Sequence, residues 1–200
     1  MSARIGLLAP AILGLIAMTA SVHGADVEAG RRKSGPCAAC HGVDGNATIP
    51  GTPSLAGHPE YYTHWQLIMF RNERRRDPQM TPIAAALSDE DMADLAGYYA
   101  AQASRPRPER PGIDSAARDT GERLASTHRC SSCHGPAFMG QQAVPRLVGQ
   151  DQQYLVKRLR AYKTGTAASD LEGIMTSAAQ PLTNEEIDLL ARFIASLAPR

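Results

Sequence analysis

Cys37-Ala-Ala-Cys40-His41 and Cys130-Ser-Ser-Cys133-His134 are the two stretches that decide how this chain folds. They begin 93 residues apart and together contain all four cysteines of the 200-residue sequence. Two thiols three residues apart lie on one side of a helical turn, where both can add to the vinyl groups of a porphyrin. The next histidine can then bring an imidazole nitrogen to the iron. The motifs therefore predict two covalently bound haem c groups.

Three other uses of paired cysteines agree less well with the sequence. A zinc site would place the two pairs about 15–20 residues apart, without a histidine after each pair. A redox-active dithiol would follow a strand in a βαβ unit, and the chain has no strand-rich run of that kind. A disulfide suits an exported chain, but here it would close a very tight loop.

The first 24 residues have the pattern of a secretory signal. Arg4 gives a positive start, residues 5–18 are apolar, and Val22-His23-Gly24 offers a cleavage site before Ala25. A membrane-spanning helix needs about 20 apolar residues, more than this stretch has, although an uncleaved anchor is the alternative. We expect a soluble periplasmic protein, cleaved near Gly24, and leave open whether it associates peripherally with the membrane.

The charge of the mature chain is balanced overall but uneven along its length. Removal of the signal takes away one Arg of 21 Lys and Arg, which leaves 20 basic and 20 acidic side chains. Nucleic-acid binding calls for a dominant basic face, so we expect no such partner. Residues 25–104 carry a net charge of −3 and residues 105–200 one of +3. This dipole could orient the protein between redox partners; a solvated surface without that role is the alternative.

The chain contains an internal repeat. Pro53-Ser-Leu55-Ala-Gly57 matches Pro145-Arg-Leu147-Val-Gly149 at an offset of 92 residues. Prolines between the halves favour an extended connector. Each half is too small for a large apolar core, and a porphyrin would supply the missing apolar mass. We therefore predict domain 1 over residues 25–104, a Pro-rich linker over 105–115 and domain 2 over 116–200.

Helical patterns recur in both halves. Ser88-Asp-Glu-Asp and Thr183-Asn-Glu-Glu are N-terminal capping sequences, and apolar residues follow each of them at helical spacing. Residues 61–71 and 153–163 form a second matching pair of predicted helices. No alternating strand pattern of useful length is present, so the sequence predicts an all-α fold.

Repeat symmetry selects two methionines as candidate ligands on the iron face opposite the histidine. Met80 and Met175 lie 39 and 41 residues after His41 and His134, and they alone align between the halves. We expect both in loops before the last helix of each half. Core packing is the alternative role for any single methionine.

Two further histidines, His58 and His64, could compete as ligands in the first half. Their counterparts in the second half, Gln150 and Val156, cannot bind iron in the same way. We therefore interpret His58 and His64 as surface or helix histidines. Ligation of one haem by two histidines is the alternative.

These haem motifs, loop methionines and Pro-x-Leu-x-Gly segments make the chain resemble the dihaem cytochrome c4 family over residues 26–197. The resemblance implies two tandem class I cytochrome c domains that face each other about a pseudo-twofold axis. It places the haem propionates near the interface and implies fast electron transfer between the haems. It also implies that the Pro53 carbonyl orients His41 and the Pro145 carbonyl orients His134. The alternative is that these prolines only make a turn rigid.

One stretch departs from that family. Class I domains open with an amphipathic helix that packs on the last helix through a glycine, and Gly121 and Leu124 fit this role against Phe193. In the first half the residues before Cys37 are hydrophilic and include Pro36. We therefore expect an incomplete N-terminal helix there.

These features indicate an electron carrier and not an enzyme. A histidine–methionine pair leaves no open position on iron and raises its reduction potential. We expect one-electron transfer in the periplasm, toward a respiratory complex such as a terminal oxidase. The alternative is a dihaem subunit of a periplasmic dehydrogenase, such as a flavocytochrome c sulfide dehydrogenase. A dihaem peroxidase needs a haem that can open a site, and the paired methionines argue against it.

Overall fold

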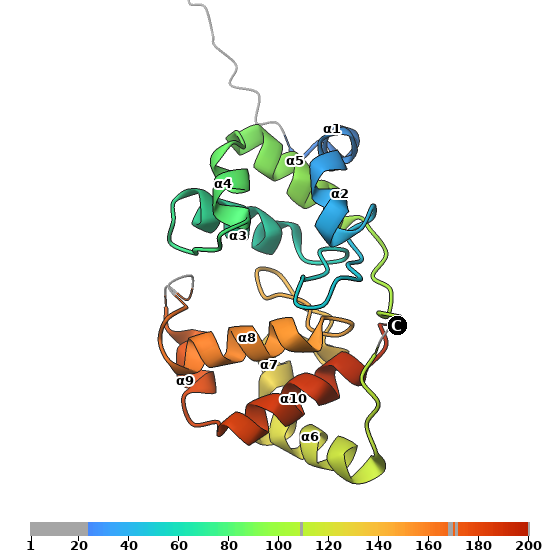
Figure 1. Cartoon of the computed structure of the whole chain (residues 1–200), viewed down its shortest axis with the longest axis vertical. Helices are drawn as coiled ribbons and strands as arrows, with labels where there is room; N and C mark the ends of the chain where they lie inside the picture. The colour runs from blue at the N-terminus through green and yellow to red at the C-terminus, as the bar shows by residue number, and fades with distance from the viewer. Residues whose placement is uncertain (1–23, 109, 168–169, 171, 200) are drawn as a thin grey trace, which may run out of the picture.

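Two groups of helices form the computed structural model, which describes residues 24–199 except 109, 168–169 and 171 (Figure 1). Apart from an isolated bridge between Gln141 and Val144, the described residues form no strand, and the prediction of an all-α fold is confirmed. The first group is α1 (Val27–Lys33), α2 (Gly35–His41), α3 (Glu60–Arg71), α4 (Met80–Ala85) and α5 (Asp89–Ala100). The second is α6 (Ser115–Thr127), α7 (Cys130–His134), η1 (Pro136–Phe138), α8 (Gln152–Lys163), α9 (Ile174–Ala179) and α10 (Asn184–Ser196).

The two groups occupy opposite ends of the molecule and repeat one arrangement (Figure 1). The most extensive helix packing is within each group: α1 and α3 pack on α5, while α6 and α8 pack on α10. The segment between α5 and α6 runs along one side of the molecule from one group to the other. None of the described helices is both long and apolar enough to cross a membrane. The predicted signal sequence, except Gly24, lies outside the described residues.

The last helix of each half begins at the predicted capping sequence. The Ser88 hydroxyl accepts from the Asp91 backbone N–H, and the Asp91 carboxylate accepts from the Ser88 backbone N–H. Thr183 and Glu186 make the same reciprocal pair at the start of α10. These bonds satisfy two donors of each first turn and fix where the helix starts. The apolar residues that follow are buried: Met92, Leu95, Ala96 and Tyr99 in α5; Ile187, Leu190, Ala191 and Ile194 in α10.

The first helix of each half crosses the last one at a glycine. A Cβ added to Gly121 would lie 2.5 Å from the Cβ of Phe193, so α6 and α10 are too close for a side chain at this point. A Cβ added to Gly30 would lie 2.7 Å from the Cβ of Tyr98 and still closer to the α5 backbone. The predicted glycine contact of the second half is confirmed. The first half makes the same contact, which its hydrophilic sequence did not indicate.

Ion pairs replace apolar packing at this crossing in the first half. Helix α1 has 7 residues against 13 in α6, which confirms the incomplete N-terminal helix. Leu124, three residues after the crossing glycine of α6, packs against the core of the second half. The same place in α1 is Lys33, whose Nζ lies 2.7 Å from Asp94 Oδ2 and 2.8 Å from Asp91 Oδ1. Ion pairs thus hold the short helix α1 on α5.

We predict that Lys33→Met makes the free energy of unfolding less sensitive to acid. Hydrogen bonds from Lys33 hold the pKa of Asp91 at about 2 and also lower the pKa of Asp94. A carboxyl with a lowered folded-state pKa stabilises the fold above its unfolded value of about 3.9, and this stabilisation is lost as pH falls through the folded value. Denaturant unfolding should therefore show that the free energy of unfolding falls less between about pH 6 and pH 2 in the variant than in the wild type.

Arg31→Met is the matched control for this change. Arg31 lies on the same helix, but its ion pair with Glu28 is exposed. Its acid profile should follow that of the wild type, because exposed pairs contribute little. If the free energy of unfolding falls equally with acid in Lys33→Met and the wild type, the role of the Lys33 contacts is contradicted.

Candidate haem sites

Each Cys-x-x-Cys-His motif forms a short helix that ends at its histidine. Helix α2 ends at His41 and α7 at His134, and the glycine that follows each has a positive φ, 79° at Gly42 and 78° at Gly135. Such a backbone conformation stops a helix and suits glycine. Both imidazoles are buried, with 7% and 6% of each residue exposed. The motif therefore brings an inward-facing ring to the end of the turn that carries the thiols.

A proline carbonyl fixes each of these rings. The Nδ1 atom of His41 lies 2.8 Å from the Pro53 carbonyl oxygen, and that of His134 lies 2.9 Å from the Pro145 carbonyl oxygen. An Nδ1–H that donates to a carbonyl leaves Nε2 as the nitrogen with a free lone pair. Burial lowers the pKa of both histidines, and the carbonyls only partly oppose this, so the rings are neutral near pH 7. Both proline contacts expected from the family resemblance are present.

The four thiols complete a donor set that fits haem c. None of them is in a disulfide, and the two motifs match in exposure: Cys37 and Cys130 are half-buried, Cys40 and Cys133 exposed. Burial raises the pKa of Cys37 and Cys130. Each half thus presents two uncrosslinked thiols and one neutral imidazole, which are the groups that a covalently attached haem requires.

The two candidate methionines occupy matched places, but in helices and not in loops. Met80 is the first residue of α4 and Met175 the second residue of α9, and both are half-buried. The prediction of loops was wrong because each segment closes into one six-residue helix before the last helix. Pro82 did not prevent this in α4, because the first turn of a helix needs no internal backbone donors.

An aspartate positions the backbone of each methionine. Alignment of the two halves of the sequence did not identify these aspartates. Asp77 Oδ1 accepts from the Met80 backbone N–H at 3.2 Å, and Asp170 Oδ1 accepts from that of Met175 at 3.2 Å. Asp77 lies three residues before its methionine and Asp170 five, so simple alignment does not pair them. The sequence feature that could have identified them is an acidic residue just before the start of a helix.

His58 is buried between the two halves, which contradicts its interpretation as a surface or helix residue. Only 5% of it is exposed, and its Nε2 lies 3.1 Å from the Ser54 carbonyl oxygen. Gln150, its counterpart in the repeat, accepts from the Ser54 backbone N–H at 2.8 Å and donates to the Ser54 carbonyl at 3.0 Å. His64 lies within α3, as expected.

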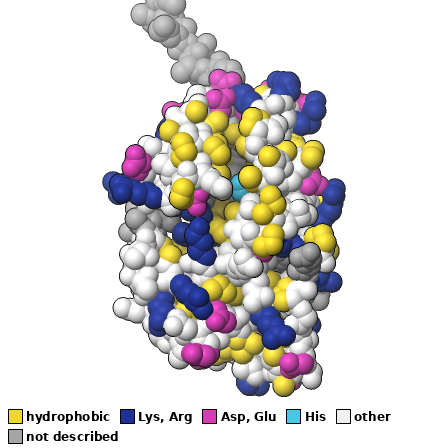
Figure 2. Space-filling view, in the orientation of Figure 1, with side chains coloured by type: hydrophobic (Ala, Val, Ile, Leu, Met, Phe, Trp, Pro, Cys, Tyr) yellow, Lys and Arg dark blue, Asp and Glu magenta, His cyan; other side chains and the backbone are white. Residues whose placement is uncertain are grey.

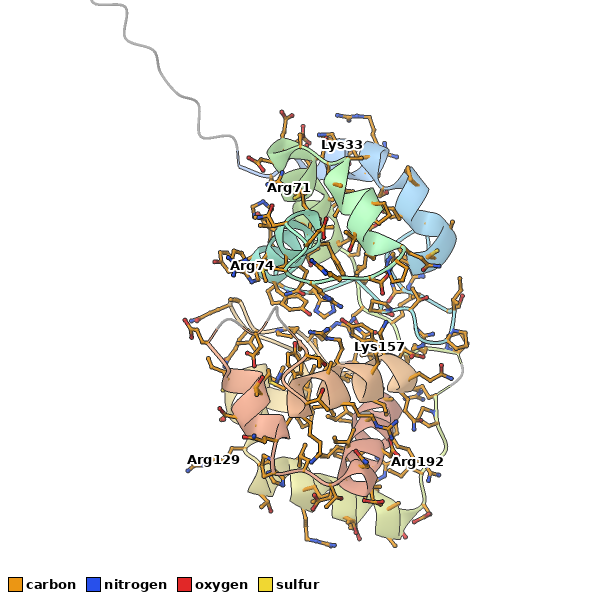
Figure 3. The ribbon with its side chains drawn as sticks, turned by 60° about the vertical axis from the view of Figure 1, so that its left-hand side comes forward. Lys33, Arg71, Arg74, Arg129, Lys157 and Arg192 are labelled. Atoms are coloured by element: carbon orange, nitrogen blue, oxygen red, sulfur yellow. The ribbon has the colours of Figure 1, made fainter. Side chains whose placement is uncertain are left out.

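Charged groups surround this contact between the halves. Arg107 of the connecting segment donates to the Ile49 carbonyl at 2.9 Å and pairs with Asp151 at 3.4 Å. Lys157 lies at the boundary in Figure 3 and reaches Asp77 of the first half at 3.4 Å. On the face shown in Figure 2, basic side chains lie on both sides of this boundary. The two candidate sites are therefore held together by a polar interface.

Known proteins resemble this chain in sequence and fold. The cytochrome c family model matches residues 27–100 and 119–198. A cytochrome c4 from Thiocapsa roseopersicina is 38% identical over 181 residues, 86% of this chain and 93% of the relative. A thiosulfate dehydrogenase electron acceptor from Stutzerimonas stutzeri is 38% identical over 175 residues, 82% of this chain and 80% of the relative. The crystal structure of reduced recombinant cytochrome c4 from Pseudomonas stutzeri has a TM-score of 0.79 at 32% identity, covering 86% of this chain and 99% of that chain.

We predict that His58→Gln reduces the loss of stability between about pH 7 and pH 4. Burial, with the nearby charge of Arg146, lowers the pKa of His58 to about 3, against about 6.5 in an unfolded chain. Between these values only the unfolded chain binds the proton, so acid favours unfolding. Glutamine, the natural residue at position 150, does not titrate. Denaturant unfolding of the holoprotein measures the difference.

His64→Gln is the control for this substitution. It removes a histidine from α3 that forms none of the hydrogen bonds joining His58, Ser54 and Gln150, and should leave the pH profile of unfolding unchanged. Identical profiles for His58→Gln and the wild type would contradict a buried, neutral His58.

Proposed function

Because this chain belongs to the cytochrome c family and is a dihaem electron carrier of the cytochrome c4 type, we propose that it moves electrons through the periplasm toward a terminal oxidase. One observation carries the proposal: each half contains a buried, carbonyl-fixed histidine and, at a matched place, a methionine whose backbone N–H donates to an aspartate. The signal-like residues 1–24 support the periplasmic location. The grouping of the helices supports residues 25–104 and 116–200 as the two domains.

We assign the haem ligands by their place in each half. Cys37 and Cys40 would hold one of the two haems through thioether bonds, with His41 and Met80 as axial ligands of its iron. The second set is Cys130, Cys133, His134 and Met175. When bound, the haems supply the reversible one-electron chemistry of iron.

The protein's own part is to keep the ligands still and the iron enclosed. The carbonyls of Pro53 and Pro145 set the tautomer and orientation of the histidines. Asp77 and Asp170 hold the backbone from which the methionines extend. A ligand set held in this way needs little rearrangement when the oxidation state changes. With a histidine and a methionine as ligands, each haem iron would keep no open position, so the sites would suit electron transfer and not substrate binding.

A second candidate role is that of electron acceptor for a periplasmic dehydrogenase. The similarity to a thiosulfate dehydrogenase electron acceptor favours it. A flavocytochrome c sulfide dehydrogenase would use a dihaem subunit in the same manner. Stable co-purification with a dehydrogenase would support this role, and a monomer that exchanges electrons freely with an oxidase would support the carrier role.

We predict that Met80→Ala and Met175→Ala each remove about half of the methionine–iron charge-transfer absorption of the ferric protein, because each deletes the sulfur ligand of one haem. Met139→Leu is the control, since Met139 is exposed and has no methionine counterpart in the repeat. It should keep the full band. An unchanged band in both alanine variants would show that the axial ligands are wrongly assigned, and an intact mass without two haems would reject both sites.

We also predict that association with charged redox partners depends on ionic strength. The halves carry net charges of −3 and +3 before the haem propionates are counted, and such a dipole favours one orientation of approach. Raising the salt from about 0.01 M to 0.1 M shortens the Debye length from about 30 Å to about 10 Å. Stopped-flow association rates should change over this range, and constant rates would contradict the steering role.

A further inference from the structure

The Arg146 side chain lies between equivalent parts of the two halves. Only 1% of Arg146 is exposed; its Nε donates to the Ala56 carbonyl at 3.1 Å and its Nη1 donates to the Val148 carbonyl. Ala56 and Val148 are equivalent in the repeat, 92 residues apart. Gly57 and Gly149 are also equivalent, and a Cβ added to each would lie 3.7 Å and 3.2 Å from nitrogens of the same guanidinium. The guanidinium therefore lies close to the pseudo-twofold axis.

Only one half can supply a side chain to such an axis. The residue that corresponds to Arg146 is Ser54, whose hydroxyl instead accepts from the Ala47 backbone N–H at 3.2 Å. A second arginine at position 54 would compete for the same space. The departure from repeat symmetry at this position thus follows from the geometry, and Arg146 serves both halves.

The third nitrogen of this guanidinium lacks a partner. Nη2 of Arg146 is buried and donates a hydrogen bond to none of the described residues. The two bonded nitrogens reach neutral carbonyl oxygens, and no salt bridge joins Arg146 to a carboxylate in the described part of the chain. Burial lowers the pKa of Arg146 to about 10, so it remains charged near pH 7. A buried cation without a counter-ion is unfavourable, which indicates that an anion belongs at this place.

Neighbouring groups do not supply that anion. Asp151 already pairs with the buried Arg107 at 3.4 Å. Arg75, a further cation at the boundary, donates to the Tyr154 hydroxyl at 2.9 Å and stacks on Phe70 with its guanidinium carbon 4.4 Å from the ring centre. The described interface therefore has more positive than negative charge, and the anion must come from outside the polypeptide.

We propose that Nη2 of Arg146 binds a propionate carboxylate of the haem held by Cys130 and Cys133. This inference rests on the proposed haem sites. A haem propionate is an anion that the complete protein contains and the polypeptide alone does not. Arg146 directly follows Pro145, whose carbonyl fixes the histidine of that site, so the guanidinium starts from the backbone beside this haem. A fixed buried cation disfavours the ferric state and makes the reduction potential of the second haem higher.

The test is potentiometric titration of the holoprotein with Arg146→Gln, and Arg107→Gln as the matched control. Arg146→Gln should lower the reduction equilibrium constant of the second haem by about tenfold, which corresponds to about 59 mV for one electron. Arg107→Gln removes another buried interface arginine, which pairs with Asp151 and not with the proposed propionate, and should shift that potential less than Arg146→Gln does. Arg146→Lys keeps the charge and should retain most of the wild-type potential. Ferric haem methyl resonances, assigned with the methionine variants, distinguish the two haems.

Three results would overturn the proposal. A second-haem potential that does not change in Arg146→Gln would show that the nitrogen binds only water. Equal shifts in Arg146→Gln and Arg107→Gln would assign the effect to a loosened interface. A shift confined to the first haem would show that Arg146 acts on the haem held by Cys37 and Cys40, and not on the one proposed. If Arg146→Gln does not fold, a tenfold change in Arg146→Lys would equally contradict the charge effect. A wild-type protein without the methionine–iron band would instead reject the proposed ligands, so the two failures can be told apart.

Discussion

The hydrogen bond between a haem-motif histidine and a proline carbonyl is the contact on which each half depends. It joins the end of the motif helix to the start of the Pro-x-Leu-x-Gly segment, at 2.8 Å in the first half and 2.9 Å in the second. The leucine of each segment, Leu55 or Leu147, packs on the core of its own half. On either side of this leucine, Ser54, Ala56 and Arg146 make contacts with the other half. One short segment therefore sets the imidazole and builds the interface at the same time.

Because the same segment holds the histidine and lines the interface, the interface contains backbone polar groups. Backbone atoms of Ser54 bind the side chain of Gln150 at 2.8 Å and 3.0 Å, and the Ala56 carbonyl accepts from Arg146. Extended backbone near a domain boundary has unpaired donors and acceptors, and burial requires that they be satisfied. Side chains of the other half do this. The relative position of the two candidate haem sites is thus fixed by backbone that the motif histidines already hold.

Local sequence patterns predicted the features that depend on neighbours in the chain. The two haem motifs, the capping boxes at Ser88 and Thr183 and the repeat all lie within short stretches, and the structure contains the helices they indicate. The prediction failed where contacts join distant residues and where a helix is very short. His58 looked like a surface residue because nothing near it in the sequence shows that Gln150 covers it. The six-residue helices at Met80 and Met175 were read as loops because they are too short to show a periodic apolar pattern.

The two halves differ for two separate physical reasons. Lys33 replaces an apolar residue far from the boundary, where either ion pairs or packing can hold the first helix on the last. Arg146 replaces a serine at the pseudo-twofold axis, where identical side chains from both halves would collide. The first difference acts on how the first helix is held on the last one. The second places one buried charge where only one domain can provide it. A repeat protein built about such an axis therefore acquires two unequal electrostatic environments, and unequal environments give electrons a preferred direction between otherwise similar haems.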